Sequence, residues 1–225
     1  MLAYNERANL AAACQEAWAA LSALDRPFEL VLVDDGSTDG TGAEADRLAA
    51  EHPSVRVIHH GTNRGLGGGY RTGLAEARGT YLSFFPADGQ FVAAEIFGPF
   101  LREMEGGADL VLGYLPDRPS SLAAKALSRA ERLLYGALFG PFPRFQGVLM
   151  VRMSVVRAVP LVSEGRGWAV IMELILKVAH GPYRVVGVPN RLRPRQSGQS
   201  KVNNVATVVA NLRQLWPLWR EIGRG

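Results

Sequence analysis

The chain has little cysteine, little charge and no long apolar run. Cys14 is the only cysteine among 225 residues, which excludes a disulfide scaffold and is typical of a reducing compartment. Charged residues make up 20% of the chain and hydrophobic residues 48%, so the composition excludes intrinsic disorder. The longest uncharged stretches, residues 133–143 and 202–212, are too short for a membrane-spanning helix, which needs about 20 apolar residues. Because Glu6 and Arg7 also interrupt the N-terminus before a signal-peptide core can form, we expect a soluble, cytoplasmic, globular domain.

The formal net charge of +4 is unevenly distributed. Residues 184–225 contain seven arginines, one lysine and one glutamate, a net charge of +7 on a body that carries −3. Such a basic segment predicts an anionic partner: the phosphates of a ligand, an acidic membrane face or nucleic acid. Nucleic acid is the least favoured, because Pro194 and Gly198 break the segment and it contains no recognised nucleic-acid module. A solvated helix face without a partner is the alternative.

Apolar runs alternate with stretches of helical periodicity along most of the chain. Short connections between them favour an α/β fold with a largely parallel sheet and helices on both faces. The predicted strands are 28–33, 55–60, 81–85, 109–115, 148–152 and 183–188, and the predicted helices are 5–24, 40–51, 66–78, 93–105, 120–139, 168–180 and 202–221.

An acidic cluster follows the first of these strands. Ligands of open α/β sheets bind beyond the carboxyl ends of the strands, where Asp34 and Asp35 stand. Carboxylates there can accept hydrogen bonds from ribose hydroxyls or from the N–H edge of a base. Helix capping explains residues 37–39, Ser-Thr-Asp, but not two consecutive acids before Gly36. We therefore expect Asp35 to contact a nucleoside.

A glycine-rich stretch, residues 63–70, lies between a predicted strand and a predicted helix. Glycines that open a helix can present backbone N–H groups to phosphate, as in dinucleotide-binding folds. The dinucleotide pattern fails at its third glycine, where Tyr70 stands. Close packing of the helix against the sheet is the alternative for these glycines, and the sequence does not decide between the two.

A third cluster, Pro-Ala-Asp-Gly-Gln at 86–90, follows the strand predicted at 81–85. Mg²⁺ or Mn²⁺ on a diphosphate takes one or two protein oxygens and fills its other positions with phosphate and water. Asp88 and Gln90 fit that need, whereas turn propensity explains only Pro86 and Gly89. The four histidines show no metal-ligand spacing, so we expect them to be solvated or packed.

Together these motifs resemble, in order, those of family 2 glycosyltransferases. They are Tyr-Asn-Glu at 4–6, Val-Asp-Asp-Gly-Ser-Thr-Asp at 33–39, Asn-Arg-Gly-Leu-Gly at 63–67 and Ala-Asp-Gly-Gln at 87–90. Residues 193–201, Arg-Pro-Arg-Gln-Ser-Gly-Gln-Ser-Lys, are similar to an element of the dolichyl- and polyprenyl-phosphate mannose and glucose synthases. The resemblance implies the GT-A fold, inverting chemistry, a UDP- or GDP-sugar donor and a Mg²⁺ or Mn²⁺ cofactor.

The resemblance also implies the roles of individual residues. Asp88 and Gln90 would hold the metal, while Asp88 and Glu173 would be catalytic. Arg195 and Lys201 would close over the phosphates. The residues expected to bind the nucleotide sugar are Tyr4, Asn5, Glu6, Asp34, Asp35, Asn63, Gly65, Ala87, Arg195 and Lys201.

Three functions remain open for this sequence. The first is transfer of a hexose to a polyprenyl phosphate, an anionic acceptor that needs no general base. The second is transfer to a hydroxyl of a glycan or glycolipid, with Glu173 as the base. The third is a non-catalytic nucleotide-sugar-binding protein, which is suggested by Pro86 where the family usually has an Asp.

Other positions depart from the family pattern. Tyr114 and Leu115 stand where an Arg is common, with Arg118 as a substitute, and an Asp expected before Gly147 is absent near Pro143. Only three residues precede Tyr4, where the family has a full apolar strand, so we expect a truncated first strand in a GT-A domain spanning 1–201. Residues 202–225 form the predicted C-terminal amphipathic helix. Its tryptophans and arginines suit either packing or a peripheral contact with the inner face of the cell membrane.

Overall fold

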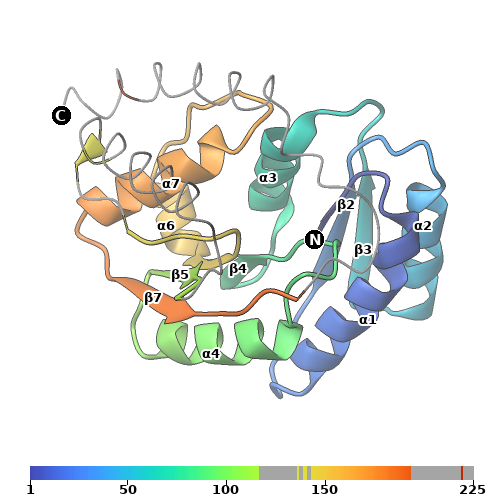
Figure 1. Cartoon of the computed structure of the whole chain (residues 1–225), viewed down its shortest axis with the longest axis horizontal. Coiled ribbons are helices and arrows are strands. Elements are labelled where there is room, and N and C mark those ends of the chain that lie inside the picture. Colours follow the sequence, from blue (N-terminus) through green and yellow to red (C-terminus); the bar gives the residue numbers. More distant parts are fainter. Residues whose placement is uncertain (117–135, 137–138, 141–142, 194–218, 220–225) are drawn as a thin grey trace, which may run out of the picture.

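Strands and helices alternate along the chain in the computed structural model, which describes residues 1–116, 136, 139–140, 143–193 and 219 (Figure 1). The strands are β1 (Leu2–Ala3), β2 (Leu30–Asp34), β3 (Val55–His59), β4 (Tyr81–Phe84), β5 (Leu110–Tyr114), β6 (Leu149–Arg152) and β7 (Val185–Pro189). The helices are α1 (Arg7–Ser22), α2 (Thr41–Glu51), α3 (Gly65–Glu76), α4 (Ala93–Glu105), α6 (Met153–Ala158) and α7 (Ala169–His180).

The strands form two adjoining sheets. One has the order β1-β2-β3 and is parallel, while the other has the order β4-β6-β5-β7. Strand β6 runs antiparallel to both β4 and β5, whereas β5 and β7 are parallel. A single parallel bridge between Leu2 and Pro86 joins the two sheets. The expected parallel α/β architecture is therefore confirmed, with β6 as the antiparallel strand among those described.

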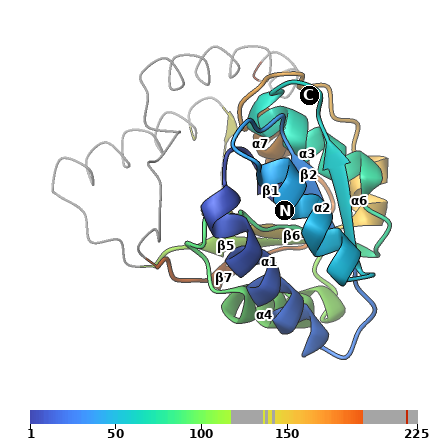
Figure 2. The ribbon, with the colours of Figure 1, turned by 90° about the vertical axis from the view of Figure 1, so that its right-hand side faces the viewer.

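Helices cover both faces of the sheets, and each face has its own apolar cluster. On one face α1 packs against α4 (Figures 1 and 2), and Leu10, Ile96 and Phe100 are almost fully buried between helices and strands. On the other face α7 packs beside α3, and Leu112 and Leu174 belong to the buried cluster. Burial on both faces explains the nearly continuous apolar strands.

Most predicted elements within the described residues are confirmed, with shifts of a few residues at their ends. Helix α6 was not predicted, because its six residues are too few to show a helical period. The helices predicted at 120–139 and 202–221 lie almost wholly outside the described residues, as do Arg195 and Lys201. Of the helices in the described ranges, none combines the length and the apolar character needed to cross a bilayer.

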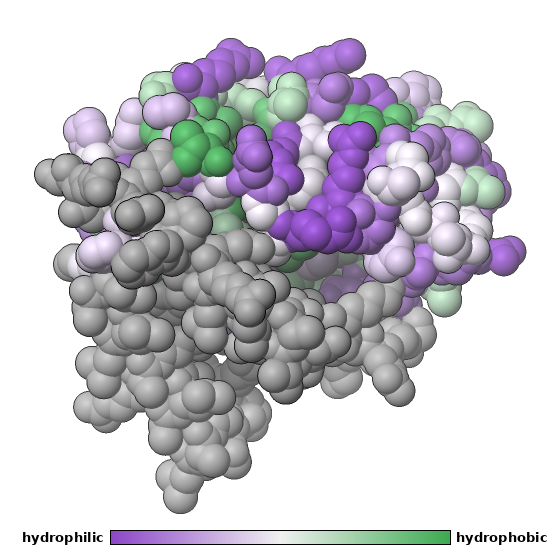
Figure 3. Space-filling view, turned by 90° about the horizontal axis from the view of Figure 1, so that it is seen from above, coloured by the Kyte–Doolittle hydropathy of each residue, from purple (hydrophilic) through white to green (hydrophobic). Residues whose placement is uncertain are grey.

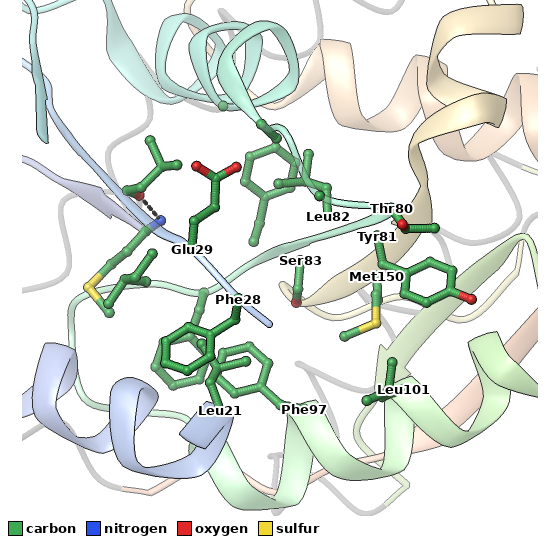
Figure 4. A pocket seen from close by; sticks show the side chains of 18 of the residues that line it. Leu21, Phe28, Glu29, Thr80, Tyr81, Leu82, Ser83, Phe97, Leu101 and Met150 are labelled. Carbon is green, nitrogen blue, oxygen red and sulfur yellow. Dashed lines mark hydrogen bonds between the residues drawn. The ribbon is translucent and has the colours of Figure 1, made fainter. Parts of the chain in front are cut away.

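Strand β1 has two residues, and a cavity borders it. The cavity of about 560 Å³ is lined mainly by apolar side chains of β2, β4, β6, α1 and α4, among them Leu21, Phe97 and Met150 (Figure 4). It extends from the segments that precede β2 and β4 along both strands as far as Val33 and Phe85. The α-amine of Met1 borders this cavity and donates a hydrogen bond to Val31 O at 2.7 Å. Burial lowers the pKa of that amine from 8.0 to about 5.

This buried amine makes stability depend on pH. Between pH 5 and pH 8 the unfolded chain binds a proton at Met1 that the folded chain does not, so stability should rise with pH across that range. Across this range the free energy of unfolding should rise by roughly 4 kcal/mol at most. Urea unfolding of the chain beginning at Met1 measures the slope, and the same chain acetylated at Met1 is the control. Equal slopes for the two forms would contradict the buried, neutral amine.

Candidate active site

The acidic and polar motifs meet at one edge of the sheets. Residue Ala3 pairs with Asp34, Asp34 pairs with His59, and Leu2 bridges to Pro86. The segments that follow β1, β2, β3 and β4 therefore begin side by side. Seen from above, the described surface mixes hydrophilic side chains with intermediate and hydrophobic ones (Figure 3).

The segment after β1 is hydrogen-bonded to the loop after β2. Backbone N–H groups of Asn5 and Glu6 donate to Ser37 Oγ at 3.0 Å and to Thr41 Oγ1 at 2.9 Å. The Asn5 side chain accepts a hydrogen bond from the N–H of Thr38 at 2.9 Å, and its positive φ of 51° is one that asparagine tolerates. These bonds fix the backbone beside Tyr4, whose side chain is exposed. Contacts of Tyr4, Asn5 and Glu6 with a nucleotide stay predictions.

Asp34 and Asp35 are both buried and both hydrogen-bonded. Asp34 Oδ1 accepts the N–H of Ser37 at 3.1 Å, and Oδ2 lies 3.1 Å from His59 Nδ1. Hydrogen bonds that the His59 ring makes to the carboxylates of Asp46, which has the larger effect, and of Asp34 raise the pKa of His59. The first acid of the pair therefore orders its own turn and the end of β3.

Asp35 joins three elements through one carboxylate. It is 7% exposed and accepts the N–H groups of Arg64 and Gly65, each at 2.8 Å, at the start of α3. His60 Nδ1 lies 2.7 Å from the same carboxylate, and His60 Nε2 lies 2.8 Å from Thr72 Oγ1. A neutral imidazole protonated on Nδ1 satisfies both contacts. The nucleoside contact of Asp35 stays a prediction, but capping of α3 already accounts for an acid at this position.

The glycine-rich stretch serves close packing. A Cβ on Gly65, whose φ is 75°, would lie 2.5 Å from Arg166 O, and one on Gly67 would lie 2.1 Å from Gly165 O. The N–H of Gly65 is taken by Asp35 and that of Gly67 by Arg166 O. The packing alternative is thus favoured over a dinucleotide-type phosphate loop, because these N–H groups already have partners within the protein.

The Asp88 loop lies beside the chain that follows β7. Asp88 Oδ1 accepts the N–H of Gln90 at 3.1 Å, and Ala87 is buried. Phe91 bridges to Leu192, and the N–H of Arg193 donates to Gln90 O at 2.8 Å. Arg193, whose guanidinium is paired with Glu16, thus brings the basic segment alongside the loop predicted to hold a metal.

The donor set of this loop fits an ion that is completed by a ligand. One carboxylate, from Asp88, and one amide oxygen, from Gln90, are donor types that Mg²⁺ and Mn²⁺ accept. Within the described ranges no group of three or more His, Cys, Asp or Glu gathers that could hold an ion alone. The residues present therefore suit a divalent cation shared with a diphosphate.

Glu173 lies inside the protein. It is fully buried on α7, and its carboxylate accepts the N–H groups of Val162 and Ser163 at 2.8–3.2 Å and the ammonium of Lys177 at 2.6 Å. Burial alone would raise the pKa of Glu173, but these hydrogen bonds outweigh it and lower the pKa. The predicted general base therefore has the surroundings of an internal anchor.

Residues that the sequence reasoning did not select also lie at this edge. The Arg144 guanidinium carbon is 6.0 Å from the centre of the Tyr114 ring, at the end of β5. This places a cation close to a position where the family pattern lacks its Arg. Asn190 is buried next to Gly113, and its side-chain amide has no hydrogen-bond partner in the part of the chain that the structure describes. His60 gave no signal either, because its partners are distant in sequence.

Comparison with known proteins decides the family. The profile of glycosyl transferase family 2 matches residues 1–154. The chain belongs to this family. It is 31% identical over 201 residues to an undecaprenyl-phosphate mannosyltransferase of Micrococcus luteus, covering 82% of this chain and 80% of that protein. It is 30% identical to a polyprenol monophosphomannose synthase of Mycolicibacterium smegmatis, covering 89% of this chain and 78% of the relative.

Solved structures support the same fold. A mannosyltransferase from Pyrobaculum calidifontis, solved with GDP-Man and Mn²⁺, superposes with a TM-score of 0.66 at 18% identity, over 100% of this chain and 63% of that one. The chain therefore spans less than two thirds of that structure. The expected GT-A fold and the assignment as a glycosyltransferase are confirmed, which removes the non-catalytic alternative.

Replacing Asp35 with Asn tests the junction of β2, β3 and α3. Asp35→Asn should lower the free energy of unfolding by about 2–4 kcal/mol, because an amide nitrogen cannot accept from buried donors. Urea unfolding measures the loss. Asp46→Asn, which changes an exposed partner of His59, is the control and should cost at most about 1 kcal/mol. Similar losses in both variants would contradict the proposed junction.

Proposed function

We propose that this glycosyltransferase moves a hexose from a nucleoside-diphosphate sugar to a polyprenyl phosphate, with inversion at the anomeric carbon. The main support is the hydrogen bond from the N–H of Arg193 to Gln90 O, which brings the basic segment to the Asp88 loop. That segment carries positive charge suited to a departing nucleoside diphosphate. The names of the relatives favour mannose, and GDP-mannose is the first donor to test.

In this proposal Asp88 and Gln90 hold Mg²⁺ or Mn²⁺ against the diphosphate. When bound, the ion supplies charge stabilisation of the leaving group. The proposal keeps for Arg195 and Lys201, which lie outside the described residues, the predicted role of closing over the phosphates. The remaining residues predicted to bind the nucleotide sugar lie after β1, β2, β3 and β4, and they form the nucleoside side of the same edge. These are Tyr4, Asn5, Glu6, Asp34, Asp35, Asn63, Gly65 and Ala87.

The buried position of Glu173 favours a phosphate acceptor over a hydroxyl acceptor. A hydroxyl must lose a proton as it attacks, which calls for a base within hydrogen-bond reach. Glu173 was the residue predicted for that role, and its carboxylate is fully buried and occupied by Val162, Ser163 and Lys177. A phosphate monoester is already anionic near neutral pH and attacks without such a base.

A polyprenyl phosphate also places the reaction at a membrane surface. The proposal therefore includes peripheral attachment to the cytoplasmic face through residues 202–225, where Trp216 and Trp219 stand three residues apart among arginines. Trp219 is an exposed large apolar residue.

A transfer assay tests the function. We expect sugar transfer from GDP-mannose or UDP-glucose to a short-chain polyprenyl phosphate and none to the matching polyprenol, with activity lost in EDTA and restored by Mn²⁺ or Mg²⁺. Asp88→Asn should lower kcat/KM at least about 100-fold through weaker stabilisation of the diphosphate. Glu95→Gln, an exposed carboxylate on the next helix, is the control and should leave kcat/KM unchanged. Equal transfer to polyprenol, or full activity of Asp88→Asn, would overturn the proposal.

A further inference from the structure

The loop that connects α6 to α7, residues 160–168, is anchored at its first half by a buried charge. Glu173 on α7 accepts the N–H groups of Val162 and Ser163, and the Lys177 ammonium links the Glu173 carboxylate to Pro160 O at 2.7 Å. Burying a carboxylate is costly unless it is paired and hydrogen-bonded. The ion pair of Glu173 and Lys177 therefore holds the first half of this loop in place.

The second half of the loop is fixed to α3. Arg71 Nη1 donates to Ser163 O at 3.1 Å and to Gly165 O at 3.2 Å, and the N–H of Gly67 donates to Arg166 O at 2.8 Å. The loop backbone sits directly on Gly67, where any Cβ would lie 2.1 Å from Gly165 O. Both halves of the loop are thus held, one by α7 and the other by α3.

The loop held in this way presents the exposed side chain of Arg166. Its guanidinium donates to Asn63 Oδ1, and Asn63 Nδ2 in turn donates to Asp35 O at 3.3 Å, at the carboxyl end of β2. Among the described residues no carboxylate forms an ion pair with Arg166 or with its neighbour Arg64. The Arg166 guanidinium therefore lies beside Asn63 at the ligand edge, without an ion-pair partner in the part of the chain that the structure describes.

We propose that Arg166 binds a phosphate group in the active site and that Glu173 positions it through the 160–168 loop. The guanidinium offers parallel N–H donors that match phosphate oxygens, and a held backbone lowers the entropy lost on binding. The proposal rests on the proposed function, in which phosphate occurs in both the donor and the acceptor. Glu173 is then a positioning residue, because its carboxylate touches the loop and no reacting atom.

Two binding measurements identify which phosphate Arg166 contacts. The Kd of GDP and of UDP, each with Mn²⁺, is measured by calorimetry, and the KM for polyprenyl phosphate is measured by transfer. Arg166→Gln should raise one of these constants at least about tenfold, while the thermal midpoint stays unchanged. A raised nucleotide Kd assigns Arg166 to the donor diphosphate, and a raised acceptor KM assigns it to the acceptor phosphate. Arg157→Gln, another exposed arginine close by in sequence, is the control.

The role of Glu173 is separated from that of a base by a double variant. Glu173→Gln should raise the same constant as Arg166→Gln, and should have no further effect on it in the Arg166→Gln background. The acidic limb of the pH profile of kcat should stay in place in Glu173→Gln, since a positioning residue donates and accepts no proton in the reaction. Should Glu173→Gln not fold, Arg71→Met, which releases the loop from α3, replaces it with the same expectation.

Three results would overturn the inference: Arg166→Gln behaving like Arg157→Gln, equal effects of Glu173→Gln in both backgrounds, or loss of the acidic limb of kcat. Failure of the proposed function looks different. In that case the unmodified protein transfers no sugar to polyprenyl phosphate, whereas the calorimetric effect of Arg166→Gln on nucleotide binding is still measured without turnover. A tenfold weaker nucleotide Kd would then support the inference by itself.

Discussion

The carboxylate of Asp35 is the contact on which the ligand edge of this glycosyltransferase depends. It joins the end of β2 to the first N–H groups of α3 and to His60 after β3. These elements come from separate parts of the chain, and each brings polar groups that water would otherwise satisfy. Because the three donors converge on one buried acid, the direction of α3 and the position of Asn63 are set together. The loop at 160–168 is hydrogen-bonded to α3 through Arg71 and Gly67.

Local patterns in the sequence were sufficient for most of the fold. The strands from β2 to β5 and the helices between them follow from apolar runs and helical periods, which are properties of neighbouring residues. The direction of β6 and the existence of α6 did not follow, because they depend on pairing with β4 and β5 and on packing. The family resemblance supplied the GT-A fold, which periodicity alone could not.

The site was predictable as a set of motifs but less so as a set of roles. Asp35 and Glu173 were both recognisable as acids of functional interest, yet most of their hydrogen-bond partners lie 10–30 positions away in the sequence. The glycines at 65 and 67 could be either a phosphate loop or a packing surface, and only the approach of residues 165–167 favours packing. His60 and Arg166 were missed because neither belongs to a motif, and because the residues they hydrogen-bond are distant in the sequence.

The two edges of the sheets differ in chemistry, and this difference bears on the acceptor. The cavity that reaches the amino ends of β2 and β4 is lined mainly by apolar side chains, with Arg26 and Arg78 beside Glu29 and Glu105. At the carboxyl ends, Arg64 and Arg166 stand on the α3 side and the basic segment arrives beside Gln90 from β7. Arginines thus lie at this edge both on the α3 side and in the chain after β7, where Arg193 is paired with Glu16. A reaction with phosphate in both substrates needs such an arrangement, because the donor diphosphate and the acceptor phosphate repel each other unless cations lie around both. A hydroxyl acceptor carries no charge that needs such cations, but it requires a general base. The carboxylate predicted for that role, Glu173, is buried and hydrogen-bonded within the protein.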